Sequence, residues 1–133
     1  MTLPPLVDAA WVREHLGEEG VGALWEKQRS VLFSEHADSK VVERARELVF
    51  DQDPEELATA VEAMRDRPDS TDLIRESDAK ILVARGEYDP FLSVEEAHAM
   101  SDSFYNFYGS GHLPSLERPR EFKELLTEFL ADA

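Results

Sequence analysis

Apolar residues in the first half of the chain recur at the spacing of an α-helix, and no segment there alternates like a strand. The clearest helix start is Asp53-Pro54-Glu55-Glu56, which combines a capping acid, a proline in the first turn and a glutamate three residues after the cap. The pattern predicts four helices: one from the cap Asp8 to the stop Gly17, one after Gly20–Gly22, one capped by Asp38 or Ser39, and one from Asp53 that ends before Pro68.

The second half of the chain mixes strand patterns with helical ones. Ala79–Arg85 is a short, mostly apolar run that stops at Gly86, which is typical of a parallel strand covered on both faces. Ser103–Tyr108 is rich in aromatic residues and predicts a second strand. Between them, Ser93 and Glu96 form a capping box that begins a helix. A last helix after Pro119 carries an amphipathic stripe of Phe122, Leu125, Leu126, Phe129 and Leu130.

The fold class that follows is α/β: a helical N-terminal half and then a β-α-β-α unit with two parallel strands and a right-handed crossover. A chain of 133 residues suits one domain with one core. The loop over Arg65–Ser70 is the expected boundary between its halves, residues 1–67 and residues 68–133.

Charge and composition exclude several classes of function. The chain has 14 basic and 29 acidic residues and a formal net charge of −15, so it lacks the positive surface that nucleic acids or anionic membranes require. No apolar run approaches the roughly 20 residues of a membrane-spanning helix, and the first residues do not resemble a signal peptide. The absence of cysteine removes disulfides, thiolate metal sites and a cysteine nucleophile. These features predict a cytoplasmic protein.

Two loops that follow the predicted strands carry candidate chemistry. Asp89 lies four residues beyond Arg85, and His112 lies four residues beyond Tyr108. Adjacent parallel strands are about 4.8 Å apart, and ligands and catalytic groups collect at their carboxyl ends. A carboxylate in contact with one imidazole nitrogen fixes the tautomer and stabilises the imidazolium when the other nitrogen takes a proton. We therefore expect Asp89 and His112 to face each other.

These stretches resemble the C-terminal part of an α/β-hydrolase of the small esterase, lactonase and C–C hydrolase kind. The resemblance implies that Asp89, in the Gly-x-x-Asp after the first strand, is the acid of a catalytic triad. It implies that His112, in the Gly-x-Gly-His after the second strand, is the base. It also implies that the helices before Pro68 form a cap and that the chemistry needs no cofactor. The matching stretches are Arg67–Asp69, Ile81–Asp89, Gly109–Pro119 and Phe122–Leu130.

The sequence departs from that family in one respect. The family's nucleophile lies in a Gly-x-Ser-x-Gly elbow before the cap, and these 133 residues contain no such motif. Ser110 is no substitute, because it is not on a strand-to-helix elbow and lies two residues from the histidine. Two hypotheses follow. In one, a second chain with the missing strands supplies the nucleophile, and a small ester or lactone is hydrolysed. In the other, the chain is a non-catalytic remnant that acts as a binding or homo-oligomerisation module.

Other residues have both a functional and a structural interpretation. Glu117 could bond loop backbone or could simply be solvated ahead of Pro119. The histidines at 15, 36 and 98 share no metal-ligand spacing, so no metal site is expected. Four aromatic side chains could line a substrate pocket, as cap residues do in the family, or could pack in the core: Trp11, Trp25, Phe33 and Phe50.

The predicted sheet leaves one edge without a partner. A two-stranded parallel sheet is a poor folding unit, because its outer strand exposes unpaired amides and carbonyls. We expect the Ile81–Arg85 edge to be closed by antiparallel pairing in a homodimer, or by a chain that carries the missing hydrolase half.

Overall fold

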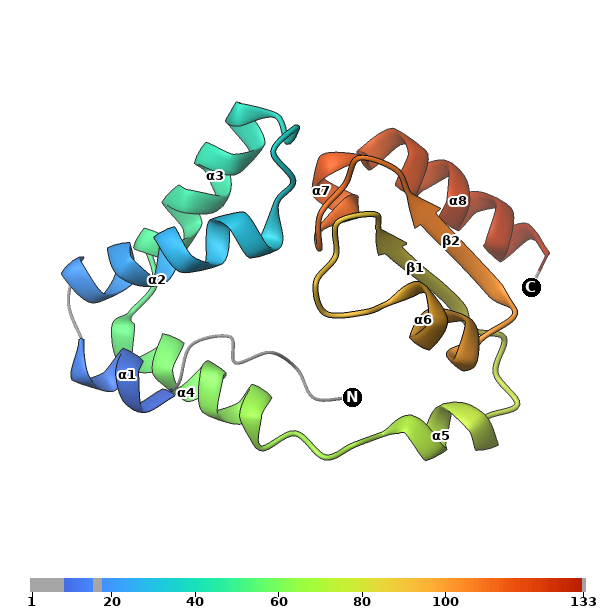
Figure 1. Cartoon of the computed structure of the whole chain (residues 1–133), viewed down its shortest axis with the longest axis horizontal. Helices are drawn as coiled ribbons and strands as arrows, with labels where there is room; N and C mark the ends of the chain where they lie inside the picture. The colour runs from blue at the N-terminus through green and yellow to red at the C-terminus, as the bar shows by residue number, and fades with distance from the viewer. Residues whose placement is uncertain (1–8, 16–17, 133) are drawn as a thin grey trace. The chain divides into compact units, whose positions relative to one another are not determined.

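The computed structural model describes residues 9–15 and 18–132, which form a mixed α/β structure divided into two compact units (Figure 1). The first unit contains the described residues up to Ser30 together with Ser39–Pro68. The second contains Val31–Asp38 together with the described residues from Asp69 onward. The first unit therefore ends inside the loop where the sequence places the boundary, but Val31–Asp38 belongs to the second unit, which the sequence did not indicate.

The first unit is helical, as predicted. Its elements are α1 (Ala9–Glu14), α2 (Glu18–Leu32, whose last two residues are part of the second unit), α3 (Ser39–Phe50) and α4 (Pro54–Arg65). Asp53 caps α4 as expected, because its Oδ1 accepts hydrogen bonds from the backbone of Glu55 at 2.9 Å and of Glu56 at 3.2 Å. The predicted cap Asp8 and stop Gly17 lie outside the described residues.

The predicted start of the second helix is wrong. Gly20 and Gly22 lie inside α2 rather than before it. A helical glycine costs about 1 kcal/mol relative to alanine. The buried side chains of Val21, Leu24 and Trp25 on the same helix outweigh that local cost.

The second unit contains the parallel sheet (Figure 1). Its elements are α5 (Thr71–Glu76), β1 (Leu82–Gly86), α6 (Val94–Met100), β2 (Ser103–Phe107), α7 (Pro114–Glu117) and α8 (Pro119–Ala131). β1 and β2 pair in parallel, from Leu82 beside Ser103 to Gly86 beside Phe107. Both strands, their parallel pairing and the Ser93–Glu96 capping box of α6 were predicted. Fully buried Phe107 packs against Tyr105 and Phe122, whose ring centroids lie 4.8 and 5.8 Å away.

The two short helices α5 and α7 were not predicted. The Asp69 carboxylate accepts hydrogen bonds from the backbone amide and the hydroxyl of Thr71, which begins α5. Pro114 occupies the first turn of α7. Helices of six and four residues are too short to produce a periodic apolar pattern, so only such local contacts mark them.

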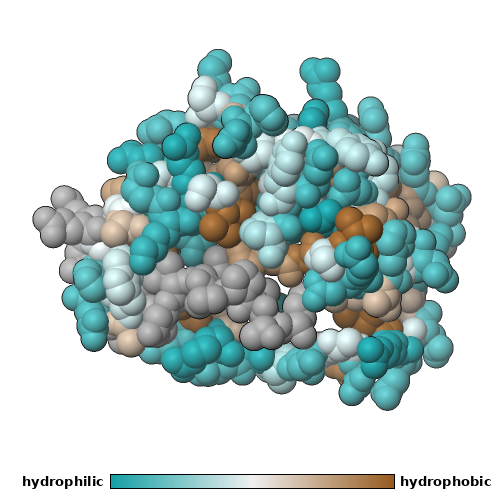
Figure 2. Space-filling view, viewed as in Figure 1, coloured by the Kyte–Doolittle hydropathy of each residue, from teal (hydrophilic) through white to brown (hydrophobic). Residues whose placement is uncertain are grey.

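Hydrophilic residues cover much of the face that Figure 2 shows, with apolar patches between them. On α8 the predicted stripe is partly exposed: Leu126 is 39% exposed and Leu130 is 68% exposed. β1 has β2 as its sole strand partner among the described residues, so its other edge is unpaired there. None of the described helices is long and apolar enough to span a membrane.

Candidate active site

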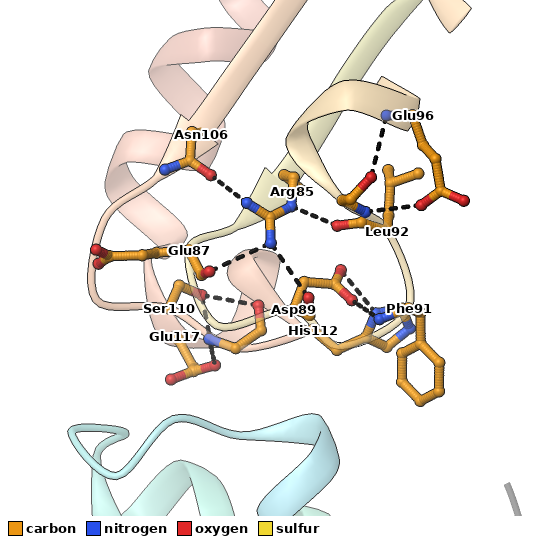
Figure 3. Close-up of polar contacts among 12 residues, drawn as sticks. Arg85, Glu87, Asp89, Phe91, Leu92, Glu96, Asn106, Ser110, His112 and Glu117 are labelled. Atoms are coloured by element: carbon orange, nitrogen blue, oxygen red, sulfur yellow. Dashed lines mark hydrogen bonds and ion pairs between the residues drawn. The ribbon is translucent and has the colours of Figure 1, made fainter. Parts of the chain in front are cut away.

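The loops after the two strands bring an aspartate and a histidine together. We call residues 87–93, between β1 and α6, the acid loop, and residues 108–113, between β2 and α7, the histidine loop. Oδ2 of Asp89 lies 3.0 Å from Nδ1 of His112, and Oδ1 of Asp89 accepts the backbone amide of Phe91 at 2.8 Å (Figure 3). The Asp89 side chain is 6% exposed. The predicted contact between the two side chains is confirmed.

One ring nitrogen of His112 is hydrogen-bonded, and the other has no partner among the described residues. Because the partner of Nδ1 is a carboxylate, Nδ1 carries the proton and donates it to Asp89. The ring meets the ring of Phe91 edge-on, with centroids 4.6 Å apart and planes at 69°. Nε2 has no hydrogen-bond partner in the part of the chain that the structure describes, and the side chain is 39% exposed. Nε2 is therefore the nitrogen that can accept and release a proton.

The pKa of Asp89 is lowered from its ordinary value. Burial raises this pKa, but the hydrogen bonds from His112 and from the Phe91 amide, with the positive charges of His112 and Arg85, together outweigh burial. Asp89 is therefore ionised at neutral pH. An ionised carboxylate against Nδ1 stabilises a positive charge on the imidazole, as a general base requires.

The two loops touch through their backbones. Gly86, at the end of β1, lies so close to the histidine loop that a Cβ there would collide with the carbonyl oxygens of Ser110 and Gly111. The Tyr88 amide donates to the Ser110 carbonyl at 2.9 Å. The Glu87 carboxylate accepts the amide of Gly109 at 2.8 Å. These contacts set the spacing between Asp89 and His112.

Glu117 connects the histidine loop to a third segment. Its Oε2 accepts the amide of Gly111 at 2.7 Å, and its Oε1 accepts the amide of Ser34 at 3.2 Å and the Ser34 hydroxyl at 2.5 Å. A Cβ on Gly111 would also meet the backbone of residues 32–34. Of the two interpretations of Glu117 in the sequence, the hydrogen bond to loop backbone is confirmed.

The four candidate pocket aromatics lie in different surroundings. Phe33 belongs to the second unit, is buried, and has its backbone beside Gly111. Trp25 is buried and Phe50 is 38% exposed beneath the Arg46 guanidinium, both in the first unit. Trp11, also in the first unit, stacks on His15 and lies 4.4 Å from the Lys27 ammonium. Their role in binding substrate stays a prediction.

The remaining histidines do not form a metal site. The His98 ring packs against Phe104, with centroids 4.4 Å apart, and His36 is exposed. Across the described residues, no group of three or more histidine, aspartate or glutamate side chains is arranged to hold a metal ion.

Sequence reasoning missed three residues at the site. Phe91 contacts both Asp89 and His112, Glu87 bonds the histidine loop, and Arg85 bonds the acid loop. Arg85 had one usable signal: it is a charged residue at the end of an otherwise apolar strand, and such a residue must find buried partners. Nothing in the sequence distinguishes Phe91 or Glu87 from ordinary loop residues.

Comparison with known proteins identifies a partial likeness to an esterase. No protein-family model matches the chain, and no curated protein matches it. Among solved structures, a thermophilic esterase from Thermogutta terrifontis with malate bound is similar to it, with a TM-score of 0.80 and 31% sequence identity. The match covers 91% of this chain and 47% of the esterase. The chain thus has an esterase-like α/β fold that spans about half the length of that protein.

Gly86→Ala tests the contact between the loops. The added methyl group would push the histidine loop away from β1, so we expect a loss of about 1–3 kcal/mol in the free energy of unfolding. Gly22→Ala is the control, because a Cβ there meets only the Phe50 ring, at 3.8 Å, and alanine favours the helix by about 1 kcal/mol. Urea unfolding of both variants measures these changes in the free energy of unfolding. A Gly86→Ala protein as stable as the parent would contradict the close approach of Gly86 to the histidine loop.

Asp89→Asn tests the charge at the site. Because the folded-state pKa of Asp89 is lowered, its charge stabilises the fold fully above the ordinary aspartate pKa, about 3.9, and this contribution disappears as the pH falls through the lowered value. The stability difference between the parent and Asp89→Asn should therefore be present above about pH 4 and shrink as the pH falls below that value. Asp102→Asn, at an exposed side chain, controls for the loss of one negative charge. A difference that grows as the pH falls below about 4 would show that the pKa of Asp89 is raised instead.

Proposed function

We propose that this chain supplies the general base and its carboxylate partner to an ester-hydrolysing site of the α/β-hydrolase kind. The observation that carries the proposal is the contact between Asp89 and His112 across two loops at the carboxyl edge of a parallel sheet. The nucleophile comes from polypeptide outside these 133 residues, because they contain no Gly-x-Ser-x-Gly elbow.

In the proposed reaction, Nε2 of His112 removes the hydroxyl proton of the nucleophile as its oxygen attacks the ester carbonyl. The imidazolium that forms is stabilised by the Asp89 carboxylate at Nδ1. When the bond to the alkoxide breaks, Nε2 gives the proton to the leaving oxygen, and an acyl-enzyme remains. A water molecule then attacks the acyl-enzyme, Nε2 takes its proton, and that proton returns to the nucleophile as the acid product leaves.

Two further observations support this reading. One similar solved structure is that of an esterase, at 31% identity over 91% of this chain. Ser110, the serine nearest in sequence to His112, is fully buried, and its hydroxyl lies 3.4 Å from both the Gly111 carbonyl and the Glu117 carboxylate rather than against the imidazole. A nucleophile from elsewhere is thus the consistent assignment. The substrate class we propose is a small ester or lactone.

The unpaired edge of β1 is the proposed junction with the nucleophile-bearing part. Among the described residues, β1 pairs with β2 alone, so its other edge is free to accept a further strand. The same edge supports a second candidate function, a homo-oligomerisation module in which the Ile81–Arg85 edges of two copies pair antiparallel. Light scattering on the purified chain separates the candidates, since only the second requires a stable dimer.

A chimera tests the proposed reaction. This chain would be joined to the part of the Thermogutta terrifontis esterase that it does not match, in the order in which the esterase carries the two parts. We expect the chimera to hydrolyse p-nitrophenyl acetate, and His112→Ala and Asp89→Asn each to lower kcat by about 10³–10⁴ because the base is lost or misoriented. The 133-residue chain by itself should give no acyl-enzyme burst and no turnover that depends on His112.

His98→Ala is the matched control, because His98 is an exposed histidine of the same unit that packs on Phe104. Circular dichroism establishes that each variant is folded. Hydrolysis by the folded chimera that is unchanged in His112→Ala would contradict the proposal. So would saturable esterase activity of the 133-residue chain that His112→Ala abolishes, because a nucleophile would then lie within it.

A further inference from the structure

Arg85 is the residue before Gly86, the last of β1, and its side chain bonds the acid loop. Its Nε donates to the Leu92 carbonyl at 2.7 Å, and its Nη2 donates to the carbonyls of Glu87 at 3.2 Å and Asp89 at 3.1 Å. Its Nη1 donates to the side-chain oxygen of Asn106, the residue beside it on β2, at 2.9 Å. Figure 3 shows the guanidinium between these four acceptors.

The setting of Arg85 is unusual for a charged side chain. The residue is 7% exposed, and no carboxylate of the described residues forms an ion pair with it. Its acceptors are three main-chain carbonyls of one loop and one amide oxygen. A buried guanidinium is costly unless its N–H groups are bonded, so the loop must keep the shape that presents those carbonyls.

We propose that Arg85 is the positioning residue for the acid: its guanidinium holds the acid loop in the one conformation that directs the Asp89 carboxylate at Nδ1 of His112. The consequence for catalysis rests on the proposed function, while the positioning is a property of the fold. Arg85 acts through the main chain, because the Asp89 carboxylate itself is bonded to the Phe91 amide and to His112.

The fork shape of the guanidinium, rather than its charge, is what the proposal requires. Three nitrogens in one rigid plane reach both ends of the acid loop and the neighbouring strand at once. A lysine ammonium in the same place would keep the positive charge, but it is a compact point charge on a flexible stem and lacks the planar fork. Arg85→Lys therefore separates positioning from simple electrostatics.

The test uses the 133-residue chain and two NMR measurements that need no turnover. Carbon-13 titration follows the pKa of the Asp89 carboxyl, and amide hydrogen exchange follows the Phe91 N–H that donates to it. The variants are Arg85→Lys and Arg85→Met, with Arg75→Met as the control. Arg75 is exposed and forms an ion pair with Asp72 at 3.5 Å.

We expect Phe91 exchange to become at least about tenfold faster in both Arg85 variants, and the Asp89 pKa to move toward its ordinary value in both. Arg75→Met should change neither. Retention of the parent values in Arg85→Lys would overturn the proposal, because charge alone would then suffice. Loss of the whole fold in Arg85→Lys would also overturn it, since Arg85 would then be a core residue rather than a loop-positioning one.

These outcomes are independent of the proposed function. A chimera that fails to hydrolyse esters leaves the effect of Arg85 on the acid loop intact. Unchanged NMR values in the Arg85 variants would remove the positioning role and leave the catalytic assignment of Asp89 and His112 intact.

Discussion

The close approach of two backbones at the carboxyl edge of the sheet constrains everything around the candidate site. Gly86 at the end of β1 and Gly111 in the histidine loop lie so near each other that a side chain at Gly86 has no room. The amide of Tyr88 bonds the carbonyl of Ser110 at the same place. With the backbones fixed in this way, the side chains of Asp89 and His112 meet at hydrogen-bond distance. Asp89 is three residues after Gly86, and His112 is one residue after Gly111.

Charged side chains that bond backbone then hold each loop in place. Glu117 accepts the Gly111 amide and joins it to Ser34, so the histidine loop is also fixed to the segment that contains Ser34. Arg85 bonds carbonyls at both ends of the acid loop. Neither carries out chemistry in the proposed reaction. The loops that carry the acid and the base are thus positioned by a carboxylate and a guanidinium that bond the main chain, and among the described residues Nε2 of His112 has no hydrogen-bond partner.

The elements that sequence reasoning predicted are those with local signals. Asp53 before Pro54 and the Ser93–Glu96 box determine helix starts within a few residues, and the apolar run up to Arg85 contains most of β1, whose last two residues are buried. The pairing of Asp89 with His112 followed from a simple rule, since loops after adjacent parallel strands share one edge.

What sequence reasoning missed depends on tertiary contacts. Gly20 and Gly22 look like a helix boundary, yet burial of the neighbouring side chains keeps them in α2. The grouping of Val31–Asp38 with the sheet depends on Ser34 meeting Glu117, 83 positions away in the chain. In the sequence, Arg85 is one polar residue in an apolar strand. The structure shows that it bonds the acid loop.

The central claim is that this chain, without any other polypeptide, presents a histidine whose Nδ1 is bonded to Asp89 and whose Nε2 is ready to take a proton. Nitrogen-15 NMR of the histidine-labelled 133-residue chain tests it directly, because the two tautomers of a neutral imidazole have distinct nitrogen shifts. The account predicts that the neutral His112 ring carries its proton on Nδ1. A neutral His112 ring protonated on Nε2 would contradict it. The Asp89 carboxylate would then face an Nδ1 without a proton, and Nε2 would be unable to take one.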